Sequence, residues 1–187
     1  MDVLELGTVP YAEALDLQRR LATERAEGKR RDTLILLEHP HVITRGPGYN
    51  GHTLGKTAHP VFDVERGGDV TYHGPGQLVG YPIVHLKERG LLVGRYLRGI
   101  ELSLTDALDG FGVRAHTIRG FTGVWTGERK IASIGVAVRS WVAYHGFALN
   151  VTTNLSQFKG IYPCGLEPER MTSMERVLGR DPGMAPL

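Results

Sequence analysis

The chain of 187 residues contains a single cysteine, Cys164. One thiol can form neither an internal disulfide nor a paired-cysteine metal motif, so the composition fits a reducing compartment. Long apolar runs are also missing, because residues 34–37 are only strand-sized and a membrane-spanning helix needs about 20 residues. The first residues lack the basic and apolar segments of a secretory signal. We therefore expect a cytoplasmic protein that does not interact with membranes.

An excess of charge of one sign is absent as well. Lys and Arg total 22 against 20 Asp and Glu, a net charge of +2 that does not indicate a nucleic-acid partner. Hydrophobic residues make up 41% and charged residues 22%, which is typical of globular proteins, and the length is that of one domain. We predict a single catalytic domain over residues 1–187, in which residues 179–187 form an irregular tail.

The apolar pattern predicts two helices, one beginning at Pro10 and ending before Gly28, the other spanning about residues 91–108. Strands are predicted at 33–38, 41–44, 61–65, 70–72, 77–86, 123–125, 130–138 and 141–151. Short turns join most of these strands, so their pairing should be largely antiparallel and the fold class α+β. Residues 45–60, rich in glycine and proline, are expected to form a mobile loop that gates a site.

The first segment with chemical potential is RGGDVTYHGPGQ at positions 66–77. Its glycines permit tight turns and allow backbone N–H groups to approach a ligand. Arg66 and His73 then lie at opposite ends of a short strand that can hold a carbonyl or a phosphate. The sequence matches neither common phosphate-binding loop. The structural alternative is a glycine-rich hairpin with a buried, hydrogen-bonded His73.

The second segment is KIASIGVAV at positions 130–138. In a regular strand Lys130 shares a face with Ala132, Ile134 and Val136, so an apolar stripe ends in an amine. Burial would lower the pKa of that amine and make it a base near neutral pH. The alternative is that Lys130 extends to solvent from the strand end.

The third segment surrounds Cys164, which lies between Pro163 and Gly165 and is therefore expected on an accessible turn. A lone cysteine is often only a small buried hydrophobe, but beside a desolvated lysine it can act as a nucleophile. Lys130 and Cys164 are thus a candidate catalytic dyad, with His145 as a competing base. The eight histidines show no metal-binding spacing, so we expect no metal site.

These segments resemble the lipoyl(octanoyl) transferase family of the biotin/lipoate protein ligase-like superfamily. The resemblance rests on RGGDVTYHGPGQ (66–77), KIASIG (130–135), YHGFALN (144–150) and YPCG (162–165), in family order and spacing. It implies an α+β fold with a larger and a smaller mixed, largely antiparallel sheet flanked by helices. It also implies an acyltransferase that moves an octanoyl group from acyl carrier protein to a lysine of lipoyl domains during protein lipoylation.

Carried over by position, the resemblance makes Cys164 the nucleophile that holds the acyl group as a thioester, and Lys130 the residue that lowers its pKa. Phe147 stands where a leucine is expected. The implied substrate-binding residues are Arg66, Gly67, Gly68, Asp69, Val70, Thr71, Tyr72, His73, Ser133, Ile134, Gly135, Gly146, Phe147 and Ala148. We further expect the octanoyl tail in an apolar tunnel built partly from Val70, Leu78, Ile134 and Val136.

The implied partners are octanoyl-acyl carrier protein as donor, and lipoyl domains of 2-oxoacid dehydrogenases and the glycine cleavage H protein as acceptors. The resemblance implies no cofactor. Because acyl carrier protein is acidic, we hypothesise a local basic docking surface. Its proposed members are Arg19, Arg20, Arg30, Arg31, Arg45 and Lys56.

Two alternatives remain at this stage. An ATP-dependent lipoate or biotin protein ligase on the same fold would activate its acid as an adenylate and would not need Cys164. A non-catalytic module that binds an acyl carrier or cofactor through the glycine turns would also keep its function without the thiol.

Overall fold

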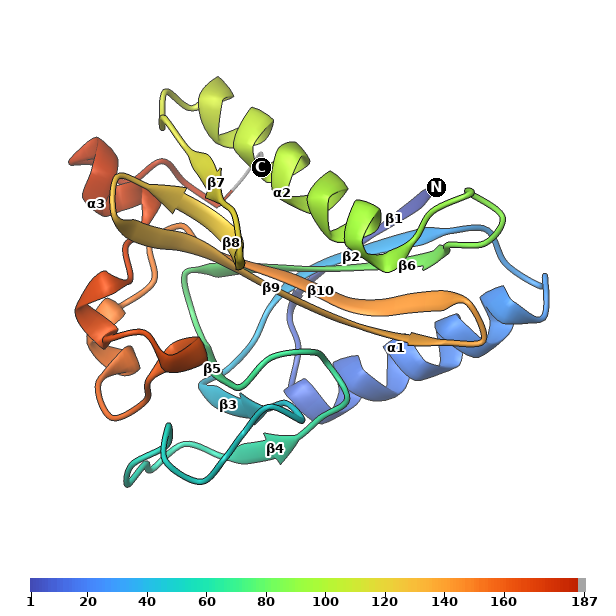
Figure 1. Cartoon of the computed structure of the whole chain (residues 1–187), viewed down its shortest axis with the longest axis horizontal. Coiled ribbons are helices and arrows are strands. Elements are labelled where there is room, and N and C mark those ends of the chain that lie inside the picture. Colours follow the sequence, from blue (N-terminus) through green and yellow to red (C-terminus); the bar gives the residue numbers. More distant parts are fainter. Residues whose placement is uncertain (185–187) are drawn as a thin grey trace.

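The computed structural model describes residues 1–184 of the chain, apart from the side chain of Cys164. Seven strands form a large sheet in the order β1-β2-β6-β10-β9-β8-β7, and three form a small sheet in the order β4-β3-β5 (Figure 1). The strands are β1 (Asp2–Thr8), β2 (Thr33–Glu38), β3 (Val42–Arg45), β4 (Val61–Asp63), β5 (Val70–His73), β6 (Gln77–His85), β7 (His116–Ile118), β8 (Phe121–Thr126), β9 (Arg129–Arg139) and β10 (Val142–Asn150). Among the strand pairs of the described residues, only β1–β2 and β3–β4 are parallel. The predicted α+β class with two mixed, largely antiparallel sheets is confirmed.

Two long helices cover opposite faces of the large sheet, as Figure 1 shows. Helix α1 (Tyr11–Ala26) packs against the face that carries Val79, Tyr81 and Ile83 of β6. Helix α2 (Val93–Gly110) packs against the other face, which carries Leu78 and Val84 of the same strand. Adjacent residues of a strand point to opposite faces, so β6 supplies both cores and is buried nearly throughout.

The predicted helices and strands are present, with ends that differ by a few residues. Some elements were not predicted from the sequence: β1, β7, the short helix α3 (Met174–Leu178) and the 3₁₀ turns η1 (Leu155–Phe158), η2 (Pro163–Gly165) and η3 (Pro168–Arg170). β1 and β7 are the two edge strands of the large sheet, where one neighbour and partial burial give a weak pattern. Residues 179–184 form no helix or strand, as predicted, and 185–187 lie outside the described residues.

The loop predicted over residues 45–60 begins at the last residue of β3 and contains no helix or further extended strand, but backbone hydrogen bonds fix it at several points. Gly46 and Gly48 donate to the carbonyls of Asp69 and Gly68 at 3.0 Å each, and Gly55 donates to Gly160 at 2.7 Å. These bonds favour a structural role over the mobile gate that the composition suggested. No helix of the described residues is both long and apolar enough to span a membrane.

Candidate active site

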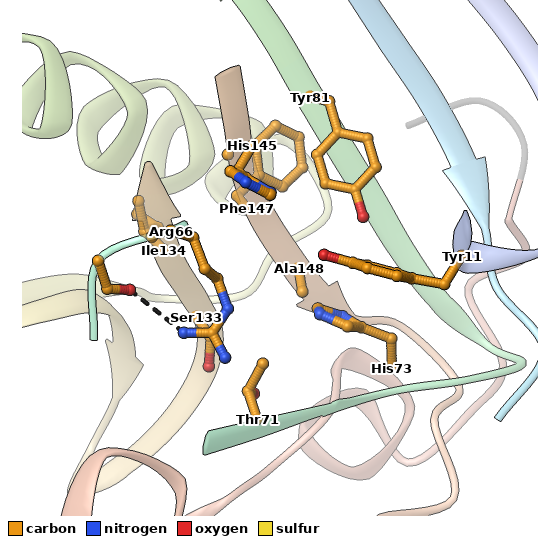
Figure 2. A pocket seen from close by; sticks show the side chains of 13 residues that line it. Tyr11, Arg66, Thr71, His73, Tyr81, Ser133, Ile134, His145, Phe147 and Ala148 are labelled. Atoms are coloured by element: carbon orange, nitrogen blue, oxygen red, sulfur yellow. Dashed lines mark hydrogen bonds between the residues drawn. The ribbon is translucent and has the colours of Figure 1, made fainter. Parts of the chain in front are cut away.

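A small pocket lies on the α1 side of the large sheet, where it meets the small sheet (Figure 2). Its volume is about 40 Å³, room for only a few water molecules. The lining residues are Tyr11, Arg66, Gly67, Thr71, His73, Tyr81, Ser133, Ile134, Gly135, His145, Gly146, Phe147 and Ala148.

Glycines form one wall because backbone passes close to backbone there. Gly67 donates its N–H to the carbonyl of Val136 at 2.9 Å, which attaches the segment before β5 to β9. A Cβ on Gly135 would lie 2.7 Å from the carbonyl oxygen of Gly67, and one on Gly146 would lie 2.2 Å from that of Gly80. Neither position admits a side chain without moving a strand.

Arg66 supplies a fixed cation at this wall. Its Nη2 donates to the carbonyl and the hydroxyl of Thr44 at 2.8 Å each, and its Nη1 donates to the Gly67 carbonyl at 3.2 Å. Figure 2 shows the guanidinium directed into the pocket, with Ser133 and Thr71 near it. Among the described residues of the lining, Arg66 alone carries a permanent charge. It is suited to stabilise negative charge on a substrate oxygen.

The two histidines of the lining are held in the neutral form. Burial lowers the pKa of His73 to about 3, although its Nδ1 donates to Gln77 Oε1 at 2.8 Å. Burial likewise lowers the pKa of His145 to about 4. The backbone N–H of His145 donates to Gln18 Oε1, while its Nε2 is buried and 3.5 Å from Glu65 Oε2, too far for a strong hydrogen bond. His73 is thus buried and hydrogen-bonded, as in the glycine-rich hairpin given above as the structural alternative. It also lines the pocket.

Lys130 is 3% exposed, so the burial predicted from the sequence is confirmed. The face predicted for it is wrong, because β9 is not regular at its start. On β8, Val124 pairs with Ala132, and the next residue, Trp125, pairs with Lys130. Ile131 of β9 therefore has no partner on β8 and is one extra residue in that strand. This β-bulge turns Lys130 to the side of Trp125, and its Nζ lies 5.5 Å from the centroid of the indole ring.

Cys164 belongs to the turn η2, which packs against β5, and its side chain lies outside the described residues. Backbone hydrogen bonds anchor the chain on both sides of this turn. Tyr162 donates to the Thr53 carbonyl at 2.8 Å, and Thr172 donates to the carbonyl of Lys130 itself at 2.9 Å. Lys130 also forms an isolated parallel bridge with Met171. The chain that leaves the cysteine turn therefore passes through η3 and then lies against the backbone of Lys130.

Comparisons with known proteins agree with this geometry. Residues 10–186 match the family described as Lipoyl protein ligase A/B catalytic domain. A curated protein of Solibacter usitatus named Octanoyltransferase is 51% identical over 179 residues, which cover 91% of this chain and 80% of that protein. One of Geotalea uraniireducens with the same name is 50% identical, over 96% of this chain and 84% of that protein.

The chain belongs to the octanoyltransferase family. It is therefore a transferase, an acyltransferase related to lipoate metabolism. Solved structures show the shared fold: a lipoate-protein ligase A bound with ATP has a TM-score of 0.70 at 16% identity, covering 92% of this chain and 75% of that one. A biotin protein ligase of Aquifex aeolicus has a TM-score of 0.53 at 15% identity, covering 97% of this chain and 61% of that one.

The pocket is lined by ten of the fourteen substrate-binding residues that the family resemblance implied. The other four are Gly68, Asp69, Val70 and Tyr72. Gly68 and Asp69 are engaged with the 45–60 loop instead, since Gly68 accepts from Gly48 and the Asp69 carboxylate accepts from Thr53 at 2.7 Å. Val70 and Tyr72 point into the core of the small sheet, because β5 alternates them with Thr71 and His73.

Two lining residues were missed altogether, Tyr11 at the start of α1 and Tyr81 on β6. Both lie outside the family motifs and read as core aromatics in a single sequence. His145 was named only as a competing base. Figure 2 shows the tyrosine hydroxyls directed into the pocket opposite Arg66.

The apolar tunnel expected for the octanoyl tail stays a prediction, and its four residues lie in different places. Leu78 lines a larger apolar cavity of about 470 Å³ beneath α2, which shares Phe147 with the small pocket. Of that set only Ile134 lines the small pocket. Leu78 and Val136 belong to the core on the α2 side of the sheet, and Val70 belongs to the core of the small sheet.

Most of the hypothesised basic docking surface is already neutralised within the chain. Arg19, Arg30, Arg31 and Arg45 form ion pairs with Glu65, Glu24, Asp2 and Asp63 respectively. Arg20 and Lys56 form no ion pair with any residue that the structure describes. Within the same residues, no group of three or more His, Cys, Asp or Glu side chains is arranged to hold a metal ion.

Proposed function

We propose that this chain transfers an octanoyl group from acyl carrier protein to a lysine of a lipoyl domain, through a thioester on Cys164. Curated relatives at about 50% identity bear the name Octanoyltransferase. The observation that carries the mechanism is the backbone contact of residues 171–172, which follow the cysteine turn, with Lys130, a buried amine. A lysine in this position can exchange protons with a thiol on that turn.

In the first half-reaction, Lys130 takes the proton of the Cys164 thiol. The thiolate attacks the thioester carbonyl, a new carbon–sulfur bond forms to Cys164, and the bond to the carrier's sulfur breaks. Lys130 returns the proton to the leaving thiolate. One thioester replaces another, so the step needs no ATP.

In the second half-reaction, the amine of the acceptor lysine attacks the Cys164 thioester. Its reference pKa is near ~10.4, so a base must remove a proton for the amide to form. Lys130 takes this proton and delivers it to the Cys164 sulfur, which leaves as the thiol. Arg66 and the backbone N–H groups beside the glycines stabilise the oxyanion in both steps.

His145 is the less suitable base. With its pKa lowered to about 4, its imidazole has little affinity for a proton at neutral pH. Its Nε2 is also buried and lies 3.5 Å from Glu65 Oε2. We therefore assign both proton transfers to Lys130.

The test is the intact mass of the protein after mixing with octanoyl-acyl carrier protein without ATP. We expect an octanoyl adduct on the wild type and none on Cys164→Ser. Lys130→Met should slow adduct formation at least 100-fold, consistent with the loss of a general base, whereas Lys87→Met, which removes an exposed lysine, should not. An adduct on Cys164→Ser, or full activity of that variant, would contradict the proposal.

The same assay separates the alternatives. An ATP-dependent ligase would transfer octanoate only when ATP is added and would tolerate Cys164→Ser. A non-catalytic module would bind octanoyl-acyl carrier protein without acquiring mass or releasing the free carrier.

A further inference from the structure

We propose that Gly123 and Glu101 are positioning residues for Lys130, forming a seat across β8 in which its side chain lies. Nothing in the family motifs used above includes either residue. The inference rests on the proposed role of Lys130 as the proton-transfer group. Gly123 and Glu101 would fix the position of its side chain.

The lysine side chain lies directly over Gly123. A Cβ on Gly123 would be 2.4 Å from Lys130 Cε and 3.1 Å from its Nζ. It would also lie 2.7 Å from the carbonyl oxygen of Ala132, which cannot move without distorting β9. Any side chain at position 123 would therefore occupy the space that the lysine fills.

The backbone of β8 is shaped to provide this space. β7 and β8 pair at His116–Trp125 and at Ile118–Phe121. Between these pairs β8 has three residues and β7 has one, so residues 122–124 depart from the β7–β8 ladder. Gly123 adopts a φ of +132° there, a conformation that L side chains rarely adopt. On its other side, the bulge of β9 at Ile131 turns Lys130 toward this position.

Glu101 holds the irregular backbone in place from helix α2. Its Oε1 accepts the N–H of Gly123 at 2.9 Å, a hydrogen bond that a regular β7–β8 ladder would not leave available. Glu101 is 7% exposed, and its carboxylate also accepts a hydrogen bond from Arg98 Nη1 at 3.0 Å. A charged acceptor at a buried N–H is among the stronger hydrogen bonds of a protein.

Trp125 closes the seat beside the amine. Its indole is 1% exposed, and the Lys130 Nζ lies 5.5 Å from the ring centroid. Gly123 and Trp125 therefore restrict the position of the Lys130 side chain from two sides. A displacement of about 1 Å of a catalytic group can cost about 100-fold in rate, so the fit between Lys130 and Gly123 matters for transfer.

The direct test compares Gly123→Ala with Thr122→Ala, an exposed neighbour on the same bulge. We expect Gly123→Ala to lower kcat of octanoyl transfer about 100-fold with little change in KM for the donor, and Thr122→Ala to change neither. The pH–rate profile of Gly123→Ala should move to higher pH, because burial disfavours the charged form of an amine and a lysine expelled toward solvent loses that effect. A simple loss of stability would lower the active fraction without moving this profile.

A second pair of variants avoids the strained glycine. Glu101→Leu removes the acceptor for the Gly123 N–H, whereas Glu101→Gln keeps an oxygen at the same place. We expect Glu101→Leu to lower kcat at least 10-fold and to move the pH–rate profile in the same direction, and Glu101→Gln to recover most of both. Asp106→Leu, an exposed change on the same helix, is the matched control.

The outcomes separate this inference from the proposed function. If Lys130→Met leaves transfer intact, the role of Lys130 is wrong, whatever the other variants do. If Lys130→Met abolishes transfer while Gly123→Ala keeps the wild-type rate and pH profile, the seat is wrong. If Gly123→Ala does not fold, the Glu101 variants decide. The same rate and pH profile for Glu101→Leu and Glu101→Gln would contradict the proposed seat.

Discussion

At the scale of single residues, several positions of this enzyme require glycine because a neighbouring group occupies the space of a side chain, and not because the chain turns there. Gly80 on β6 is one such position, since it pairs with Phe147 of β10 and lies beneath its ring. A Cβ there would be 2.2 Å from Phe147 Cζ. The phenylalanine that replaces the expected leucine thus occupies the space above a glycine, on the α2 side of the sheet.

Gly80→Ala should therefore destabilise the protein by about 1–3 kcal/mol, the usual cost of overpacking a core. In the Phe147→Leu background the same change should cost clearly less, because the smaller side chain leaves space for the methyl group. The measurement is a double-mutant cycle on the free energy of unfolding in urea. Equal costs in both backgrounds would contradict the proposed packing.

At the scale of elements, a buried carboxylate ties α1 to the strands. Asp32, directly before β2, accepts from Arg25 Nε of α1 at 2.8 Å, from Arg89 Nε at 2.8 Å and from the N–H of His85 at 3.1 Å. Burial raises the pKa of this carboxyl, but the bonds from Arg25, His85 and Arg89 outweigh it, and the net shift is downward. One residue thus fixes the end of α1, the start of β2 and the end of β6.

Asp32→Ala should lower the free energy of unfolding by about 3 kcal/mol, because it leaves the buried Arg25 guanidinium with Glu88 as its remaining partner. Asp16→Ala, an exposed change on α1, should stay within about 0.5 kcal/mol of the wild type. Urea denaturation of both variants gives the comparison. A loss below 1 kcal/mol for Asp32→Ala would show that α1 is held by its apolar face alone.

At the scale of the whole molecule, three buried histidines lie where α1, the large sheet and the small sheet meet. Burial lowers the pKa of His39 to about 4, of His73 to about 3 and of His145 to about 4. The His39 ring bridges the Val9 carbonyl and the Tyr81 hydroxyl at 2.7 Å each, and it packs edge-on against His73. Burial in the folded protein therefore favours the neutral form of all three rings.

This arrangement predicts a loss of stability in mild acid. In the unfolded chain each histidine binds a proton below about pH 6.5, whereas the folded chain does so only near its lowered pKa. The free energy of unfolding should thus fall as the pH drops from about 6.5 to about 4, by up to about 1.4 kcal/mol per pH unit for each histidine. His39→Gln should reduce this slope by about a third, and His116→Gln, at an exposed position, should leave it unchanged. Urea denaturation across this pH range is the measurement, and a flat profile would contradict it.

The sequence by itself determined the α+β class, both long helices, most strands and the family, because apolar periodicity and contiguous motifs are local properties of the chain. It also indicated Arg66, His73, Lys130 and the glycine wall. Only the tertiary structure decided which residues face the pocket, since one extra residue in β9 reverses a side chain and alternation along β5 removes Val70 and Tyr72. Tyr11, Glu101 and Gly123 acquire their places through contacts between elements distant in sequence, and no local pattern records such contacts.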